Sequence, residues 1–392
     1  MFLEIIKIIF YIFLSLILIE IVIHFFDKLK NFFIYNLKKR KDFLSPSYHK
    51  YLNRYESKKP LFKYLPIGYR FFNSEDEEIS GVQCNSLGFR CPEFKEKQAN
   101  VIRVVLMGGS AAWGSGATNN DNTISGHLEQ ILNEKYEKTS FKFECINLAQ
   151  INNYISQDLL NANLFFSKLK PDYVVSFAGW NEIAACYLLD QKKLESFGTY
   201  FMEEVGELGP VSLASYRKEL IKKFLLKYLV DNSKIISFFL KKSEKKNYFF
   251  DEKKFIKEID LSSKIFIEHM RKFYLMSKGY NFNYIQFLQP HIYKKANLTE
   301  SEKKITKLYD YVRPVHGGKS FGEFLKNNSI YKEILRNYKN TENVDCFNLE
   351  NIFENNKDEI FFTLVHMNDK GYKLVAKNIS EILAKKLKIK NI

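Results

Sequence analysis

The sequence predicts an α/β protein built around a three-layer α/β/α domain of flavodoxin-like architecture. Two observations predict this class: short apolar runs recur along the chain, and helix-like stretches separate them. The runs are continuously apolar rather than alternating, which is typical of strands buried on both faces of a parallel sheet. The five predicted strands are RVVLMG (103–108), FECINLA (143–149), DYVVSFAG (172–179), NYIQFLQP (283–290) and VDCFNL (344–349).

Length and composition limit the class of protein further. The chain has 392 residues, enough for one large domain with accessory segments, and 46% of them are hydrophobic, which excludes wholesale disorder. The net charge of +15 is spread along the chain, and no basic-aromatic motif of a nucleic-acid reader occurs, so no nucleic-acid partner is expected. The five cysteines show no C-x-x-C spacing and the histidines form no ligand-spaced set. The sequence therefore predicts neither a metal nor another cofactor.

The N-terminal segment predicts a membrane anchor. Residues 5–26 read IIKIIFYIFLSLILIEIVIHFF, long enough as a helix to cross a bilayer core of roughly 30 Å. No small-residue cleavage site follows, so we expect a retained single-pass anchor over residues 1–27. Lys28, Lys30 and the basic run 38–41 follow the span, and the positive-inside rule accordingly favours a cytoplasmic position for the rest of the chain.

The remaining chain divides by composition. Residues 28–98 are polar and aromatic with four scattered prolines, which predicts a stalk and entry segment, and residues 99–392 form the α/β domain. The third and fourth strands are too far apart for one crossover helix, so a lysine-rich helical insertion is expected at about 191–258, followed by a crossover helix at 262–279. A second excursion, at about 291–340, follows the fourth strand.

The turn after the first strand, within VVLMGGSAAWGSGA (104–117), has three possible uses. A phosphate loop requires lysine where Ser115 stands, and the G-x-G-x-x-G spacing of a dinucleotide site does not occur. The remaining interpretation is that Ser110 is displayed at a strand-to-helix turn, where main-chain N–H groups would support a developing oxyanion.

Two further strand ends supply partners for Ser110. Asn181 follows the third strand in AGWNE, and His366 lies in HMNDKGYKLVA, directly before an amphipathic C-terminal helix. A hydroxyl nucleophile needs a base, and neutral imidazole suits that task near pH 7. Because ligand sites in such sheets lie beyond the carboxyl ends of the strands, we expect these residues to share one site. His291, after the fourth strand, is a candidate for its lining.

Four sequence blocks resemble those of the SGNH (GDSL-type) esterases and acyltransferases, over roughly residues 83–190 and 260–388. GGS places Ser110 at the nucleophile, with Gly109 where Asp is usual, and NLAQINNYISQ places Asn152 at the family's oxyanion-hole glycine. GWNE gives Asn181 the oxyanion-hole amide, and TLVH gives His366 the role of base. CNSLGFRCPEF and QPHIYKKANLTESE resemble the bacterial membrane-anchored branch.

The resemblance implies an oxyanion hole made of the Ser110 N–H, the Asn152 N–H and the Asn181 amide. Thr363 stands where the triad acid is usual. The group that orients His366 is left open: Thr363 as a replacement, a main-chain carbonyl, Asp358 or Asp369.

The expected function is that of a membrane-anchored serine esterase acting on acyl esters, chiefly acetyl esters of envelope glycans. With a sugar hydroxyl as acceptor, the same serine would make an O-acyltransferase. Two non-enzymatic functions compete with these: a catalytically weak glycan-binding or scaffold protein of the envelope and, from the basic insertion, a surface for anionic lipid head groups. The resemblance favours the envelope face of the membrane, in contrast to the charge rule, and the sequence predicts no oligomeric state.

Overall fold

The computed structural model describes residues 81–151, 153–183, 252–312, 321–338 and 344–387, with the short segments 62–64 and 71–73 and four single positions near the N-terminus. The chain divides into two compact units, one formed by Met1–Asp42 with Met202–Tyr248 and the other by Phe43–Phe201 with Phe249–Ile392. Nearly all of the predicted anchor, most of the predicted stalk, and residues 191–251 of the predicted insertion lie outside the described residues. Within the described part of the chain, no helix is both long enough and apolar enough to cross a bilayer.

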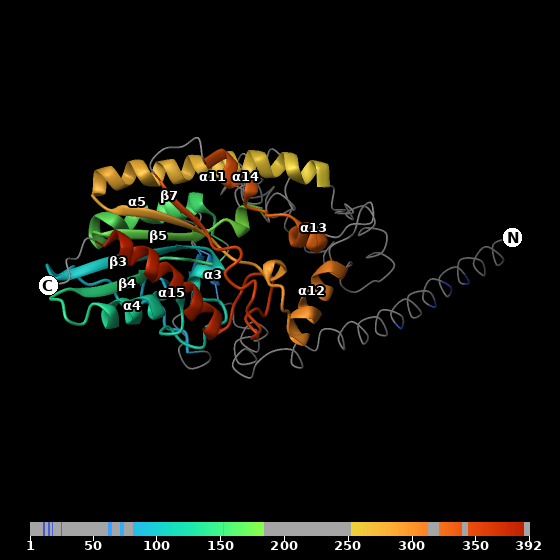
Figure 1. The fold of residues 1–392 in the computed structure, drawn as a ribbon, viewed down its shortest axis with the longest axis horizontal. Coiled ribbons are helices and arrows are strands. Elements are labelled where there is room, and N and C mark those ends of the chain that lie inside the picture. Colours follow the sequence, from blue (N-terminus) through green and yellow to red (C-terminus); the bar gives the residue numbers. More distant parts are fainter. Residues whose placement is uncertain are drawn as a thin grey trace, which may run out of the picture. The chain divides into compact units, whose positions relative to one another are not determined.

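The larger unit contains a five-stranded parallel sheet, as the sequence predicts (Figure 1). Its order is β4-β3-β5-β6-β7, which is the 2-1-3-4-5 order of flavodoxin-like sheets. Each strand coincides with a predicted run to within two residues. The strands are β3 (Val101–Gly108), β4 (Lys142–Asn147), β5 (Tyr173–Ala178), β6 (Asn283–Leu288) and β7 (Asp345–Asn348).

Helices cover both faces of this sheet (Figure 1). On one face α4 (Ile124–Lys135) packs against α15 (Asp369–Lys386). On the other face α11 (Glu252–Tyr280) packs against α5 (Ile155–Leu169) and α14 (Lys332–Tyr338). The sheet and its two helical layers form the three-layer arrangement that the sequence predicts.

The crossover helix α11 is longer than the sequence predicts. Its described part starts at Glu252 rather than near 262, so residues 252–258 belong to this helix and not to the insertion. The difference arises because EKKFIKE resembles the lysine-rich insertion in composition. Buried Phe255, Ile259 and Phe266 nevertheless continue one helical face, which packs against the domain.

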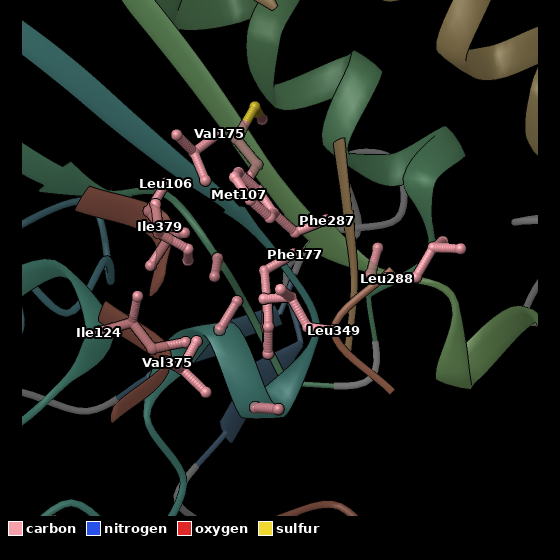
Figure 2. Packing of buried hydrophobic residues seen from close by; sticks show 14 of the residues in the cluster. Leu106, Met107, Ile124, Val175, Phe177, Phe287, Leu288, Leu349, Val375 and Ile379 are labelled. Atoms are coloured by element: carbon pink, nitrogen blue, oxygen red, sulfur yellow. The ribbon is translucent and has the colours of Figure 1, made fainter. Parts of the chain in front are cut away.

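The core explains why the strand sequences are continuously apolar. Leu106 and Met107 are successive residues of β3 and point to opposite faces of the sheet, yet both are fully buried. Figure 2 shows them among residues of β5 and β6, with Ile379 of α15 next to Leu106 and with Ile124 of α4 next to Val375 of α15. Hydrophobic burial on both faces thus stabilises the central strands. The edge strand β7 is only partly buried.

Short elements complete the described chain. In the predicted stalk, β1 (Phe62–Tyr64) pairs with β2 (Phe71–Asn73) in an antiparallel ladder. The predicted excursion after β6 contains a short 3-10 helix η2 (Ile292–Lys294), followed by α12 (Glu300–Val312) and α13 (Phe321–Asn327) and then α14. The one-turn helix α3 (Ser110–Trp113) directly follows the turn after β3.

Candidate active site

Ser110 lies at the sharp turn between β3 and α3. Gly108 ends the strand with φ +140°, and a Cβ there would lie 2.2 Å from the main-chain oxygen of Phe177, so this turn requires glycine. The main-chain oxygen of Gly109 accepts the first helical hydrogen bond, from the Trp113 N–H at 2.9 Å. The turn therefore presents Ser110 at the carboxyl edge of the sheet, between the neighbouring strands β4 and β5, where the direction of strand order reverses.

The structure brings His366 to Ser110. His366 lies on a small hairpin closed by the antiparallel bridge between Phe361 and Met367 and by a hydrogen bond from the Phe362 N–H to the His366 oxygen at 3.1 Å. Its Nε2 lies 2.7 Å from Ser110 Oγ, although the two residues are 256 positions apart. This distance is within the roughly 2.6–3.2 Å that a base needs to take the proton of a hydroxyl.

Thr363 occupies the place next to the other ring nitrogen. Its Oγ1 lies 2.9 Å from His366 Nδ1 and also accepts the main-chain N–H of His366 at 3.0 Å. Of the groups that the sequence leaves open for this role, the described structure thus places the Thr363 hydroxyl, rather than a main-chain carbonyl or a carboxylate, at Nδ1.

The two aspartates considered for this role are engaged elsewhere. Asp358 is half-exposed and pairs with Lys370 at 2.6 Å. Asp369 accepts hydrogen bonds from Thr118, from the main-chain N–H at 2.9 Å and from the hydroxyl at 2.6 Å. The structure brings neither carboxylate to His366, because each is held by partners at the start of α15 or in the loop after α3.

The Thr363 hydroxyl adds no charge beside His366 that would hold a proton on the ring. A hydroxyl can accept a hydrogen bond from Nδ1–H, which leaves the lone pair of Nε2 directed at Ser110. It carries no negative charge, however, so it does not favour the imidazolium as a carboxylate does. Withdrawal of the ring from water lowers the pKa of His366 to about 4, and the ring is therefore neutral at pH 7.

Asn181 reaches the same turn from the end of β5. Its Nδ2 donates a hydrogen bond to the main-chain oxygen of Asn153 at 2.7 Å, which uses one of its two N–H groups and fixes the orientation of the amide. A Cβ built on Gly109 would lie 2.5 Å from this same nitrogen. The Asn181 amide therefore lies against the main chain just before Ser110. This contact gives a local reason for glycine at position 109.

Two buried carboxyl groups lie behind the amide, and the sequence patterns predict no role for either. Glu182 accepts the N–H groups of Ile155, at 2.8 Å, and of Gly179, at 3.1 Å, which ties α5 to the turn that carries Asn181. Asp158 accepts the side-chain amide of Asn153 at 3.1 Å. Burial raises the pKa of Glu182 and raises the pKa of Asp158 to about 8. The glutamate of GWNE, directly after the expected oxyanion residue, is the one signal in the sequence that points to this pair.

The two remaining residues expected at the site are Asn152 and His291, and no hydrogen bond of the described residues joins His291 to Ser110 or His366. Asn152 lies outside the described residues. His291 is buried, its Nε2 lies 3.1 Å from Glu350 Oε1, and its ring lies 5.5 Å from that of Trp180, the residue before Asn181. The described residues contain no group of three or more His, Cys, Asp or Glu side chains that could hold a metal ion.

Comparisons with known proteins add structural similarities at low identity. No protein-family model matches the chain, and no curated protein matches its sequence. Among solved structures, an acetyl xylan esterase is 14% identical over 72% of this chain and 100% of its own, with a TM-score of 0.37. A lipase from a goat rumen metagenome is 12% identical over 71% and 96% of the two chains, with a TM-score of 0.38. A catalytic mutant of an acetylxylan esterase from Geobacillus stearothermophilus is 11% identical over 71% and 92%, with a TM-score of 0.36.

Proposed function

We propose that this chain is a serine esterase of the SGNH type that hydrolyses small acyl esters through a covalent acyl-serine. The observation that carries the proposal is the chain of contacts from Ser110 Oγ to His366 Nε2, at 2.7 Å, and from His366 Nδ1 to the Thr363 hydroxyl, at 2.9 Å. A serine, an oriented imidazole and a nearby amide donor together form the arrangement that acyl transfer requires.

The geometry supports a two-step reaction. His366 Nε2 takes the proton of Ser110 as Oγ attacks the ester carbonyl carbon, and the carbonyl oxygen becomes an oxyanion. The second N–H of Asn181 Nδ2 and the main-chain N–H of Ser110 stabilise this oxyanion; the Asn152 N–H, outside the described residues, is the third proposed donor. When the intermediate collapses, the proton passes from His366 to the departing alcohol. Water, with His366 again as base, then releases the carboxylic acid from Ser110.

The proposed substrate is an acetyl ester on a glycan of the cell envelope, and the proposed location is the membrane. The apolar segment 5–26 and the blocks CNSLGFRCPEF and QPHIYKKANLTESE support these finer parts of the proposal. We propose the envelope face for the domain, since the acetylated glycans lie there. The charge pattern after the span favours the opposite face.

A second candidate function is that of a catalytically weak glycan-binding or scaffold protein of the envelope. The observation that favours it is the uncharged Thr363 beside His366, which offers the imidazolium no electrostatic stabilisation. Reaction of Ser110 with an electrophilic probe separates the two candidates.

Labelling with a fluorophosphonate probe tests whether Ser110 is activated. We expect the full chain to label at Ser110 and to hydrolyse p-nitrophenyl acetate, and we expect Ser110→Ala and His366→Ala to lose both properties with unchanged circular dichroism. Ser115→Ala is the matched control, because Ser115 is a second serine just after α3 and is almost completely buried. If the wild-type chain neither labels nor turns over any acetyl ester, the scaffold function replaces the esterase.

A further inference from the structure

A fully buried ion pair lies beside the hairpin that carries His366. Lys295 Nζ and the carboxylate of Glu302 are in contact, and both side chains are completely shielded from solvent. Lys295 lies just after η2 and Glu302 in the first turn of α12, so both belong to the excursion that follows β6. Neither residue touches Ser110 or His366 in any hydrogen bond of the described chain.

The Glu302 carboxylate divides its two oxygens between two segments. Oε2 accepts the main-chain N–H of Thr299 at 2.9 Å and contacts Lys295. Oε1 accepts two successive main-chain N–H groups, those of Ile360 and Phe361, each at 3.0 Å. One carboxylate therefore joins its own excursion to the segment 360–361.

Residues 360 and 361 form the base of the hairpin that carries Thr363 and His366. Phe361 pairs with Met367 across this hairpin. The same excursion also contacts the tip of the hairpin, because the Ile292 N–H donates to the Leu364 oxygen at 2.8 Å. The hairpin is thus held at its base by Glu302 and at its tip by the main chain that follows His291.

The presence of a buried ion pair beside this hairpin is not explained by a gain in the stability of the fold. Desolvation of two charges largely offsets their attraction, so an apolar pair of similar volume often stabilises a fold equally well. Apolar contacts are non-directional, however, whereas two hydrogen bonds to one oxygen fix the position and direction of the main chain. The hairpin needs such directional contacts in this chain, because Thr363 carries no charge that would hold His366 in position.

We propose that Glu302 is a positioning residue for the base of the reaction: its Oε1 holds the 360–361 main chain, and thereby the distance from His366 Nε2 to Ser110 Oγ, with Lys295 as its counter-ion. The kinetic consequence rests on the proposed esterase function. The structural consequence, a change in the surroundings of the His366 ring, does not.

Two double variants of the full chain separate positioning from general stability. Lys295→Met/Glu302→Gln and Lys295→Met/Glu302→Leu both remove the buried charges, but only the glutamine keeps an acceptor oxygen for the hairpin. We expect the leucine variant to lose on the order of a hundredfold in kcat per fluorophosphonate-titrated site, with KM nearly unchanged. The glutamine variant should retain most of the activity. A purely structural role would lower the number of titrated sites and leave kcat per site unchanged, and that result would overturn the proposal.

Titration of His366 by NMR gives a readout that does not depend on catalysis. In wild-type protein labelled at histidine Cε1, we expect His366 to titrate near its depressed pKa of about 4. In the leucine variant this pKa should rise toward the ordinary value of about 6.5, because a loosened hairpin admits water to the ring. An unchanged titration in the folded leucine variant would overturn the proposal. If His366 shifts as expected but the wild-type chain has no esterase activity, the proposed function fails and the positioning role stands.

If the leucine variant does not fold, amide hydrogen exchange in the wild-type chain tests whether Glu302 holds the 360–361 main chain. The Ile360 and Phe361 amides should be protected as strongly as the Phe362 amide, which lies within the hairpin. Fast exchange at both amides would contradict the proposal. Glu300→Gln, which removes the exposed pair with Lys303 on the same helix, is the control and should change none of these measurements.

Discussion

Burial of the His366 ring sets the pH range in which it can act as a base. The base must be neutral, and the pKa of His366 is lowered to about 4 by burial rather than held near the ordinary value of about 6.5. Because a lowered pKa leaves the ring neutral at all higher pH values, we expect kcat/KM on a neutral ester to stay constant from pH 8 down to about pH 5 and to fall only near pH 4. A pH–rate profile that already falls through pH 6.5 would contradict this prediction.

Replacement of Thr363 by aspartate, the acid usual at this place in SGNH esterases, also tests the contact between position 363 and the His366 ring. In Thr363→Asp the new carboxylate should favour the imidazolium and the productive tautomer, so the pKa of His366 rises and the acid limb of the profile moves to higher pH. At pH 8 the activity should be equal to or higher than that of the wild type. Asp358→Asn is the control and should leave the profile unchanged, since Asp358 pairs with Lys370. An unshifted acid limb in Thr363→Asp would show that position 363 does not contact the ring.

Asn181 tests the oxyanion hole separately from the nucleophile. Because an oxyanion donor acts mainly in the transition state, Asn181→Ala should lower kcat by on the order of a hundredfold with little change in KM. Steady-state kinetics on p-nitrophenyl acetate measure both constants. A change confined to KM would instead make Asn181 a residue that binds the ground state.

At the scale of elements, the turn between β3 and α3 limits what can precede Ser110. The main-chain angles of Gly109, φ −84° and ψ −158°, suit any residue. Glycine is therefore required at this position only because there is no room for a side chain. A Cβ there would lie 2.5 Å from Asn181 Nδ2. Gly109→Ala should therefore displace the amide and lower kcat at least tenfold while the protein remains folded. Gly279→Ala in α11, where a Cβ would meet nothing within 4 Å, is the control for the substitution itself. Unchanged kcat in Gly109→Ala would mean that Asn181 does not act from this position.

The elements of the sheet could be predicted from the sequence, but the buried polar contacts could not. Strands such as β3 and β5 are buried on both faces, and their continuous apolar runs record that burial directly. Ser110 and His366 could be placed at one edge because parallel strands share a direction. Glu302 gives no such signal: its partners Ile360 and Phe361 lie 58 and 59 residues away and contribute main-chain N–H groups, which every sequence has.

At the scale of the whole molecule, the predicted anchor and the α/β domain should be separable. The sheet, both helical layers and the Ser110–His366 pair lie in the unit that excludes Met1–Asp42. Deletion of residues 1–27 should thus release the protein from membranes and leave its esterase activity unchanged. Fractionation of washed membranes and an activity assay of both fractions measure this. If the shortened chain still pellets with the membranes, a second attachment exists, and the lysine-rich insertion is the first place to look for it.

The order of the chain has a consequence for its biosynthesis. Ser110 follows the first strand of the sheet to be synthesised, whereas His366 follows the last. While a ribosome is still extending the chain, the serine turn can form between β3, β4 and β5, but the imidazole that would activate it has not yet emerged. A nascent chain therefore displays Ser110 without its imidazole partner, and the proposed reactivity toward esters can begin only after the hairpin that carries His366 has been synthesised and has docked.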